Sequence, residues 1–184
     1  MRNGGIDMNN TFKEILSNRR SVRMYTGEAV PAEALDLVVR TGLMTPRGRN
    51  LPSVELIVVK DKAALEFLSE CRPHGPGMLA GADAAVIVLG NSEVSDVWTE
   101  DCCASMTAMH LMADSLGLGS CWVQIRGRES KLEGKTAEDV CREFFGFPEN
   151  YRMEAVLSLG MPKLKNEPKS FDDVDLSMIH TERF

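Results

Sequence analysis

The chain has 184 residues, of which 43% are hydrophobic and 26% are charged. This length and composition are typical of one globular domain and exclude the class of disordered chains, which bury too little apolar surface to fold. The net charge of −6 argues against a broad nucleic-acid-binding surface, and no run of residues has the length and apolarity of a membrane span.

The first third of the chain predicts two helices. Thr11 and Glu14 have the spacing of a capping box, in which a hydroxyl and a carboxylate each satisfy a free amide, so a short helix is expected to begin there. A second helix is expected to begin near Pro31, whose fixed φ suits the first turn, and to end before Pro46.

The middle of the chain alternates predicted strands and helices. Residues 54–59 and 84–89 are short, apolar and rich in β-branched side chains, which predicts two buried strands. A helix over 62–71 is expected between them, followed by a mobile loop at 73–77 that is rich in proline and glycine. The longest predicted helix covers 97–116, and its methionines are expected to pack in the core because the helix is apolar on most sides.

The last third predicts a strand at 121–125, a helix capped by Thr136, a strand at 153–160 and a polar, extended tail after Pro162. This order indicates a mixed α/β layered domain. Strand order cannot be read from periodicity, so a Rossmann-type sheet stays open on pattern alone, although no Gly-x-Gly-x-x-Gly motif follows a predicted strand.

We expect one domain over residues 1–184, with residues 1–9 disordered or extended. The N-terminus lacks the apolar core of a signal peptide, which predicts a cytoplasmic protein. Five cysteines occur without a Cys-x-x-Cys pair or a histidine at metal spacing, so we expect reduced core thiols and no metal site. They are Cys71, Cys102, Cys103, Cys121 and Cys141.

Arginine is concentrated near the first predicted helix. Arg19, Arg20 and Arg23 fall within five residues in a chain of negative net charge, and Ser21 lies between them. Planar guanidinium groups and a hydroxyl suit a phosphate. The alternative is an ordinary solvated helix end, where arginine complements the negative end of the helix dipole.

A second polar segment lies between the second predicted helix and the first predicted strand. It contains Pro46, Arg47, Gly48 and Asn50. An asparagine amide donates and accepts at once, which suits the edge of a flavin or a base. The same residue types are also ordinary turn residues.

Four motifs in this order resemble the nitroreductase family of flavin oxidoreductases. They are Arg19 to Arg23, Thr45 to Asn50, Gly117-Leu118-Gly119 followed by Trp122, and Leu159-Gly160-Met161-Pro162. Together they extend over almost the whole chain. The resemblance implies an α+β, nitroreductase-like layered fold with a central, mostly antiparallel sheet flanked by helices. It also implies an intertwined homodimer in which the tail, residues 163–184, packs on the partner subunit.

The resemblance implies that one FMN lies at each of two sites in the subunit interface. Arg19, Arg20, Ser21 and Arg23 would contact its phosphate, ribityl chain and pyrimidine side, and Lys169 would reach the phosphate from the tail. Pro46, Arg47, Gly48 and Asn50 would approach from the partner subunit. The backbone of Gln124 and Ile125 would lie along the ring and donate to its N5. The next basic position of the family falls on Phe171, so one phosphate contact is missing here.

The implied activity is a two-step reduction, in which NAD(P)H reduces the flavin and a small-molecule acceptor such as a nitroaromatic or quinone then takes the electrons. The cofactor carries this chemistry, so no catalytic side chain is predicted. Leu51-Pro52-Ser53 and Gln124-Ile125 depart from the common family pattern. They keep a non-catalytic flavin-binding sensor or carrier open. A specialised reductive dehalogenase or alkene reductase on the same fold also stays open, because the sequence does not separate these reactions from nitroreduction. A small acidic interaction protein would leave the arginines unexplained.

Overall fold

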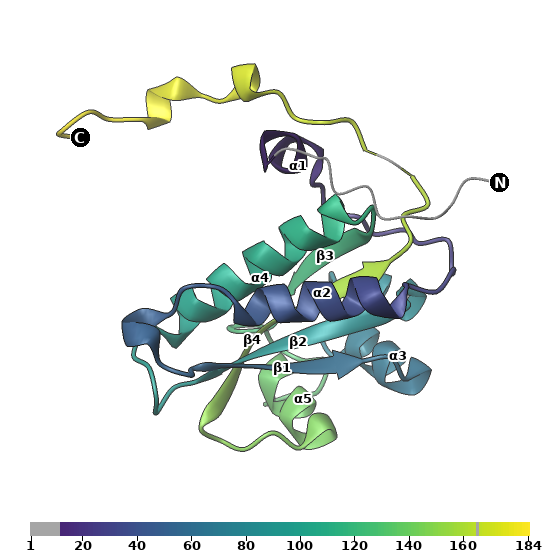
Figure 1. Ribbon diagram of the computed structural model, residues 1–184. Coiled ribbons are helices and arrows are strands. Elements are labelled where there is room, and N and C mark those ends of the chain that lie inside the picture. The colour runs from purple at the N-terminus through teal and green to yellow at the C-terminus, as the bar shows by residue number, and fades with distance from the viewer. Residues whose placement is uncertain (1–11, 165) are drawn as a thin grey trace.

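A computed structural model describes residues 12–164 and 166–184 of the protein. Four strands form one sheet: β1 (Val54–Val59), β2 (Ala84–Asn91), β3 (Gly119–Gln124) and β4 (Tyr151–Gly160). The strand order is β1-β2-β4-β3, and each neighbouring pair is antiparallel (Figure 1). This arrangement confirms the predicted antiparallel sheet and excludes the Rossmann alternative, whose strands are mostly parallel.

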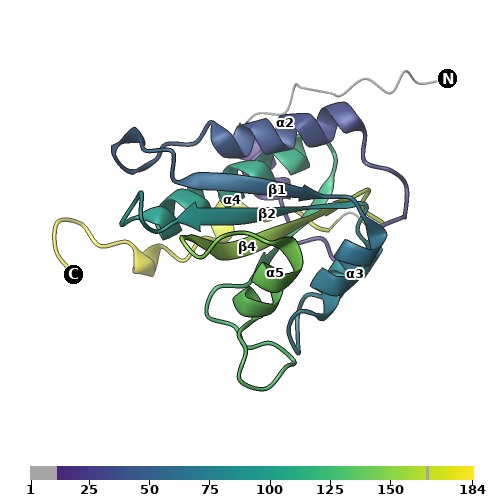
Figure 2. The same cartoon turned by 90° about the horizontal axis from the view of Figure 1, so that it is seen from below.

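Helices cover both faces of the sheet. The helices of the described residues are α1 (Phe12–Asn18), α2 (Ala32–Leu43), α3 (Lys62–Glu70), α4 (Trp98–Ser115) and α5 (Ala137–Phe145). Helix α1 contacts α4 instead of a face of the sheet (Figure 1). Helices α2 and α4 lie on one face, whereas α3 and α5 lie on the other (Figures 1 and 2). Short 3₁₀ turns occur at Gly48–Asn50, Gly77–Gly81, Phe171–Asp173 and Leu176–Met178.

The predicted elements agree with the structure apart from several boundaries. Strand β3 begins at Gly119 rather than at residue 121 and ends at Gln124, so Ile125 follows the strand. Pro31 precedes the first turn of α2 instead of lying in it. The cap at Thr136 is confirmed as a capping box, whereas the predicted cap at Thr11 lies outside the described residues.

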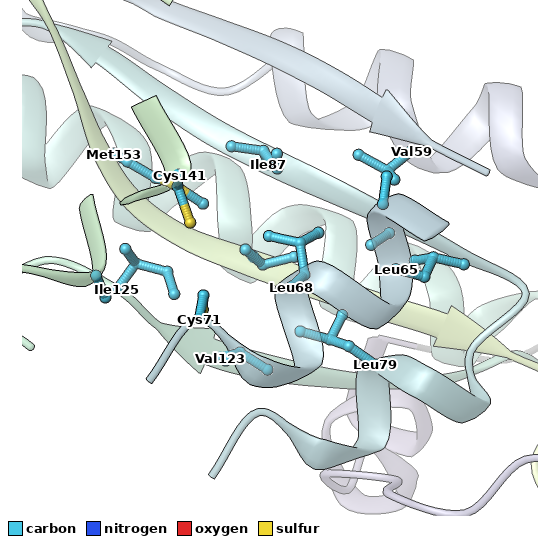
Figure 3. Packing of buried hydrophobic residues seen from close by; sticks show 14 of the residues in the cluster. Val59, Leu65, Leu68, Cys71, Leu79, Ile87, Val123, Ile125, Cys141 and Met153 are labelled. Atoms are coloured by element: carbon cyan, nitrogen blue, oxygen red, sulfur yellow. The ribbon is translucent and has the colours of Figure 1, made fainter. Parts of the chain in front are cut away.

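Each face of the sheet packs on its own apolar core. The core under α3 and α5 is shown in Figure 3, and the other lies under α2 and α4. All eight residues of β2 are buried, which explains why its sequence is apolar up to Asn91. Met106 and Met109 are fully buried, as the core prediction requires. The five cysteines are free, and all except the half-buried Cys103 lie in the interior.

Two glycines that face each other across the β3–β4 ladder make room for the segment that follows α1. Gly119 pairs with Gly160. A Cβ added to Gly119 would lie 2.8 Å from Val22, and one added to Gly160 would lie 2.6 Å from the ring of Tyr25. The Val22 N–H therefore reaches the Ser120 carbonyl oxygen at 2.9 Å, and the Tyr25 hydroxyl reaches Ser158 Oγ at 2.7 Å.

Replacing Gly160 with alanine tests this close packing. Gly160→Ala should lower the free energy of unfolding by about 1–3 kcal/mol, because the new methyl group overlaps the Tyr25 ring. Urea unfolding measures this loss. Gly81→Ala is the matched control, because a Cβ there meets no atom within 4 Å. Equal stability of the two variants would contradict the proposed role of the glycine.

Candidate functional site

The arginine-rich segment lies along the outer edge of β3. Ser21 forms a parallel bridge with Ser120, and Tyr25 forms an antiparallel bridge with Pro162. These contacts hold the backbone between them in an extended conformation. The side chains of residues 19–23 are thereby held at one end of the sheet.

These side chains line a cavity of about 320 Å³, together with two residues of the C-terminal tail. The lining residues are Arg19, Arg20, Ser21, Arg23, Asn166 and Lys169. The tail is held there by two hydrogen bonds, from Lys169 N–H to the Ser17 carbonyl oxygen at 2.9 Å and from Arg20 Nη1 to the Glu167 carbonyl oxygen at 2.7 Å. The structure thus brings five predicted site residues together, and their role toward a phosphate stays a prediction.

A buried histidine on α4 orients Arg19. Arg19 Nη1 donates to His110 Nε2 at 3.0 Å, and a guanidinium group can only donate, so Nε2 carries no proton. The ring proton is therefore on Nδ1, which donates to Ser120 Oγ. Burial, followed by the nearby charge of Arg19, lowers the pKa of His110 to about 4. His110 is consequently neutral at pH 7 and acts as an acceptor for Arg19.

The loop with the second group of predicted residues is held by another buried side chain of α4. Asp101 is 4% exposed and accepts from the Gly48 N–H at 2.8 Å and from Ser53 Oγ at 2.5 Å. Arg49 and Asn50 have left-handed backbone conformations, with φ of 52° and 55°. Such conformations need support from their surroundings, and the Asp101 carboxylate provides it.

Within one chain this loop does not reach the arginine cavity. It contacts α4 at Asp101, whereas Arg19 contacts α4 at His110, nine residues later and roughly 13 Å along the helix axis. The cavity is lined by none of Pro46, Arg47, Gly48 and Asn50. Arg47 instead donates to the Leu43 carbonyl oxygen at 2.6 Å. The two groups of predicted residues lie apart within one chain; we call them half-sites because we propose that they share one site.

The end of β3 supplies the remaining predicted residues. The Ile125 N–H donates to the Glu154 carbonyl oxygen at 3.1 Å, so this amide is used within the sheet. Because backbone groups alternate in direction along an antiparallel strand, the N–H and carbonyl of Gln124 point to the outer edge. Arg72 Nη1 donates to that carbonyl at 2.8 Å. Of the two predicted backbone donors, the structure directs Gln124 outward and Ile125 inward.

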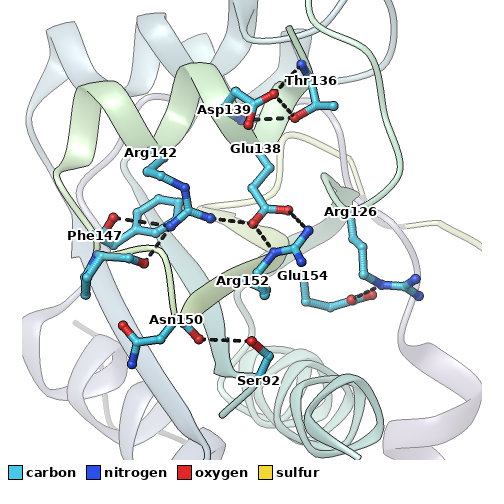
Figure 4. A network of polar contacts seen from close by, with 11 residues as sticks. Ser92, Arg126, Thr136, Glu138, Asp139, Arg142, Phe147, Asn150, Arg152 and Glu154 are labelled. Atoms are coloured by element: carbon cyan, nitrogen blue, oxygen red, sulfur yellow. Dashed lines mark hydrogen bonds and ion pairs between the residues drawn. The ribbon is translucent and has the colours of Figure 1, made fainter. Parts of the chain in front are cut away.

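A buried carboxylate accepts a hydrogen bond from the side chain of Gln124. Glu154 is the extra residue of a β-bulge in β4, since Val88 pairs with Ala155 and the next residue of β2 pairs with Met153. It is 1% exposed, accepts from Gln124 Nε2 at 2.9 Å and forms an ion pair with Arg126 at 2.5 Å (Figure 4). A bulge redirects a side chain, and here it aims a carboxylate at the end of β3.

A larger cavity of about 490 Å³ lies between α5 and β4 and contains none of the predicted site residues. Both of its arginines are paired with one carboxylate. Glu138 is buried between Arg142 Nη2 at 2.7 Å and Arg152 Nε at 2.6 Å (Figure 4). The geometry is that of a structural ion-pair network, so the smaller, uniformly cationic cavity is the candidate site.

The sequence profile of the nitroreductase family matches residues 16–74 and 75–161, which make up most of the chain. The chain belongs to the nitroreductase family.

Individual relatives extend over nearly the same length. An Archaeoglobus fulgidus protein named "Putative NADH dehydrogenase/NAD(P)H nitroreductase" is 31% identical over 176 residues, which cover 93% of this chain and 97% of the relative. The structure of an FMN-dependent nitroreductase from Clostridium difficile is 34% identical, with a TM-score of 0.89 over 92% of this chain and 98% of that chain. A Bacteroides thetaiotaomicron structure with the same name as the Archaeoglobus protein is 31% identical, with a TM-score of 0.85 over 96% of this chain and 99% of that chain.

Three residues that organise the candidate site of this family member were not predicted from its sequence: Asp101, His110 and Glu154. Each is a titratable residue inside a predominantly apolar helix or strand, and each is nevertheless buried. A titratable residue within an apolar stretch was the sequence signal that could have identified them, because a buried titratable group needs a partner. The identity of the partner depends on the fold.

The described parts of the chain contain no group of three or more His, Cys, Asp and Glu residues that could hold a metal ion. Within residues 12–164 and 166–184, each helix is too short or too polar to cross a membrane.

Protonation of His110 in acid should lower the free energy of unfolding. The folded pKa of about 4 lies below the ordinary value of 6.5, so its stabilising contribution is complete above pH 6.5 and is lost as the pH falls toward 4. Between pH 7 and pH 5 the wild type should lose about 2 kcal/mol more unfolding free energy than His110→Gln, which does not titrate. Urea unfolding at both pH values measures this difference. Equal losses would show that His110 is not the titrating group.

Proposed function

We propose that this nitroreductase-family protein is an FMN-dependent oxidoreductase that uses NAD(P)H to reduce nitroaromatics, quinones or related electrophiles. The observation that carries the proposal is the cavity at Arg19 to Arg23, whose lining includes four cationic side chains and no carboxylate. In a protein of net charge −6, such a site is suited to a compact, multiply charged anion. A phosphate monoester fits this donor set.

The guanidinium groups of the cavity have N–H donors that the contacts described do not use. In the contacts described, Arg19, Arg20 and Arg23 are each held through a single nitrogen. A guanidinium group has five N–H donors in a planar fork, so each can still present donors to phosphate oxygens. Ser21 and Asn166 add neutral hydrogen-bonding groups to the lining.

We propose further that the active protein is a homodimer with FMN at the subunit interface. The separation of the two half-sites in one chain supports this arrangement, because a second copy could supply the loop with Arg47 and Asn50. The tail also supports it. Leu176, Met178 and Ile179 are 69%, 77% and 65% exposed in the single chain, and such a group of apolar side chains favours burial against a partner.

FMN, when bound, supplies hydride transfer between the nicotinamide and the acceptor. The chain would hold the phosphate through Arg19, Arg20 and Arg23 and would offer the outward Gln124 N–H to the ring. The buried Glu154 would keep that strand end rigid through its bond to the Gln124 side chain. These are binding and orienting roles, so no side chain is assigned as a general acid or base.

The visible spectrum of the purified protein tests the cofactor and the activity together. The protein should be yellow or become yellow with FMN, lose this colour with NADPH or NADH, and regain it with a nitroaromatic or quinone. Protein that stays colourless with added FMN would overturn the cofactor assignment. Protein that binds FMN but does not turn over NAD(P)H with any acceptor would instead be a flavin-binding sensor or carrier.

Mixed dimers test the shared site. One chain carries Arg19→Ala with Arg23→Ala, and the other carries Arg47→Ala with Asn50→Ala. If each site combines the arginine segment of one protomer with the loop of its partner, a mixed dimer holds one wild-type site, and FMN binding returns. Each variant alone should bind FMN poorly, through loss of charge-assisted bonds worth about 1.5–3 kcal/mol each. Absence of rescue in mixed dimers would place both half-sites within one chain.

A further inference from the structure

Arg72 lies at the same strand edge as the outward Gln124 N–H. It follows Cys71, the C-cap residue of α3, and in Figure 3 Cys71 lies beside Val123 and Ile125. Arg72 Nη1 donates to the Gln124 carbonyl oxygen at 2.8 Å. Because the N–H and carbonyl of one strand residue point to the same side, the guanidinium group lies next to the Gln124 donor.

The positive charge of Arg72 is held in place but not neutralised. The Gly75 backbone packs directly on the guanidinium group, since a Cβ added there would lie 2.2 Å from Nη2. Arg72 Nε is buried and has no hydrogen-bond partner in the described part of the chain. The neighbouring Arg126 provides a contrast, because it pairs with Glu154 at 2.5 Å. None of the ion pairs among the described residues includes Arg72.

A second arginine follows the same strand end. Arg128 lies in the turn after β3, where its N–H donates to the Ile125 carbonyl oxygen at 3.0 Å and its carbonyl oxygen accepts from the Ala137 N–H at 2.8 Å. Its side chain is exposed. Burial, followed by the like charge of Arg128, lowers the pKa of Arg72. Because the Arg128 backbone is bonded to Ile125, the residue after Gln124, a second cationic side chain begins at this strand end, and a second positive charge favours an anion there.

We propose that Arg72 and Arg128 form an anion subsite that selects electron acceptors carrying a carboxylate. The subsite rests on the proposed function, in which the acceptor reacts beside the Gln124 N–H. Arg72 is bonded to Gln124 itself, so the anionic group must belong to the reacting ring or be attached directly to it. The pyrophosphate of a nicotinamide donor is separated from its reacting ring by a ribose, which makes a small aromatic acid the better match.

A pair of acceptors that differ in one charge tests the subsite in the FMN-loaded protein. The kcat/KM ratio of 4-nitrobenzoate to 4-nitrobenzamide is measured in the wild type, Arg72→Gln, Arg72→Lys and Arg128→Gln. The ratio should fall roughly tenfold in Arg128→Gln and in Arg72→Gln, and less in Arg72→Lys, which keeps the charge. Arg40→Gln removes an equal charge from an exposed ion pair on α2 and should leave the ratio unchanged.

Two further measurements separate the possible outcomes. Arg128→Gln keeps the Arg72–Gln124 bond, so a fall in its ratio cannot come from a disturbed strand end. The KM for NADPH should change less than the KM for 4-nitrobenzoate; the reverse result would assign the arginines to the donor and overturn the proposal. An unchanged acceptor ratio in both Arg72→Gln and Arg128→Gln would also overturn it.

Benzoate binding keeps the subsite testable if turnover is absent. Benzoate and benzamide are titrated into the FMN-loaded protein, and the change in the flavin spectrum reports their Kd values. Benzoate should bind more tightly to the wild type and lose roughly tenfold in affinity in Arg128→Gln. Equal loss for benzamide, or none for benzoate, would contradict the subsite. Tight benzoate binding without turnover would contradict the proposed function alone.

Discussion

The facing pair of Gly119 and Gly160 is the constraint on which the candidate site depends. A side chain at either position would occupy the space of Val22 or Tyr25. Without that space, the segment after α1 could not lie against the edge of β3, and residues 19–23 would have no fixed position. The glycines therefore act on the site through the space that they leave for Val22 and Tyr25.

Helix α4 carries the two buried side chains that hold the half-sites in position. Near its start, Asp101 accepts the amide of Gly48 and holds a loop with two left-handed residues. Near its end, neutral His110 accepts from Arg19. Both side chains are buried, and each has one polar atom bonded to a half-site and the other bonded to a serine hydroxyl. The helix thus fixes the spacing between the half-sites, and the close contact of Gly42 with Met109 ties the same helix to α2.

The elements were predicted well, because hydrophobic periodicity and the Thr136 cap are local signals. The grouping of residues 19–23 with Lys169 was implied by the resemblance to the nitroreductase family, since the two segments are far apart in the chain. The sequence did not predict which charged groups would be buried. Glu154 depends on a one-residue register shift against β2, and His110 depends on a partner nearly a hundred positions away in the chain. The different directions of Gln124 and Ile125 also follow from strand pairing, which local patterns do not encode.

The edge position of β3 connects the stability of the fold with its proposed chemistry. An edge strand presents unpaired backbone groups, which proteins normally cover or disrupt. Here the Ser120 carbonyl is covered by the Val22 N–H, and the Gln124 carbonyl is covered by Arg72. Along this edge the cationic cavity at Arg19 to Arg23 lies beside Ser120, and the Arg72 guanidinium lies beside Gln124. In the proposed enzyme, the bound flavin would complete the edge, so cofactor binding and strand protection would be the same interaction.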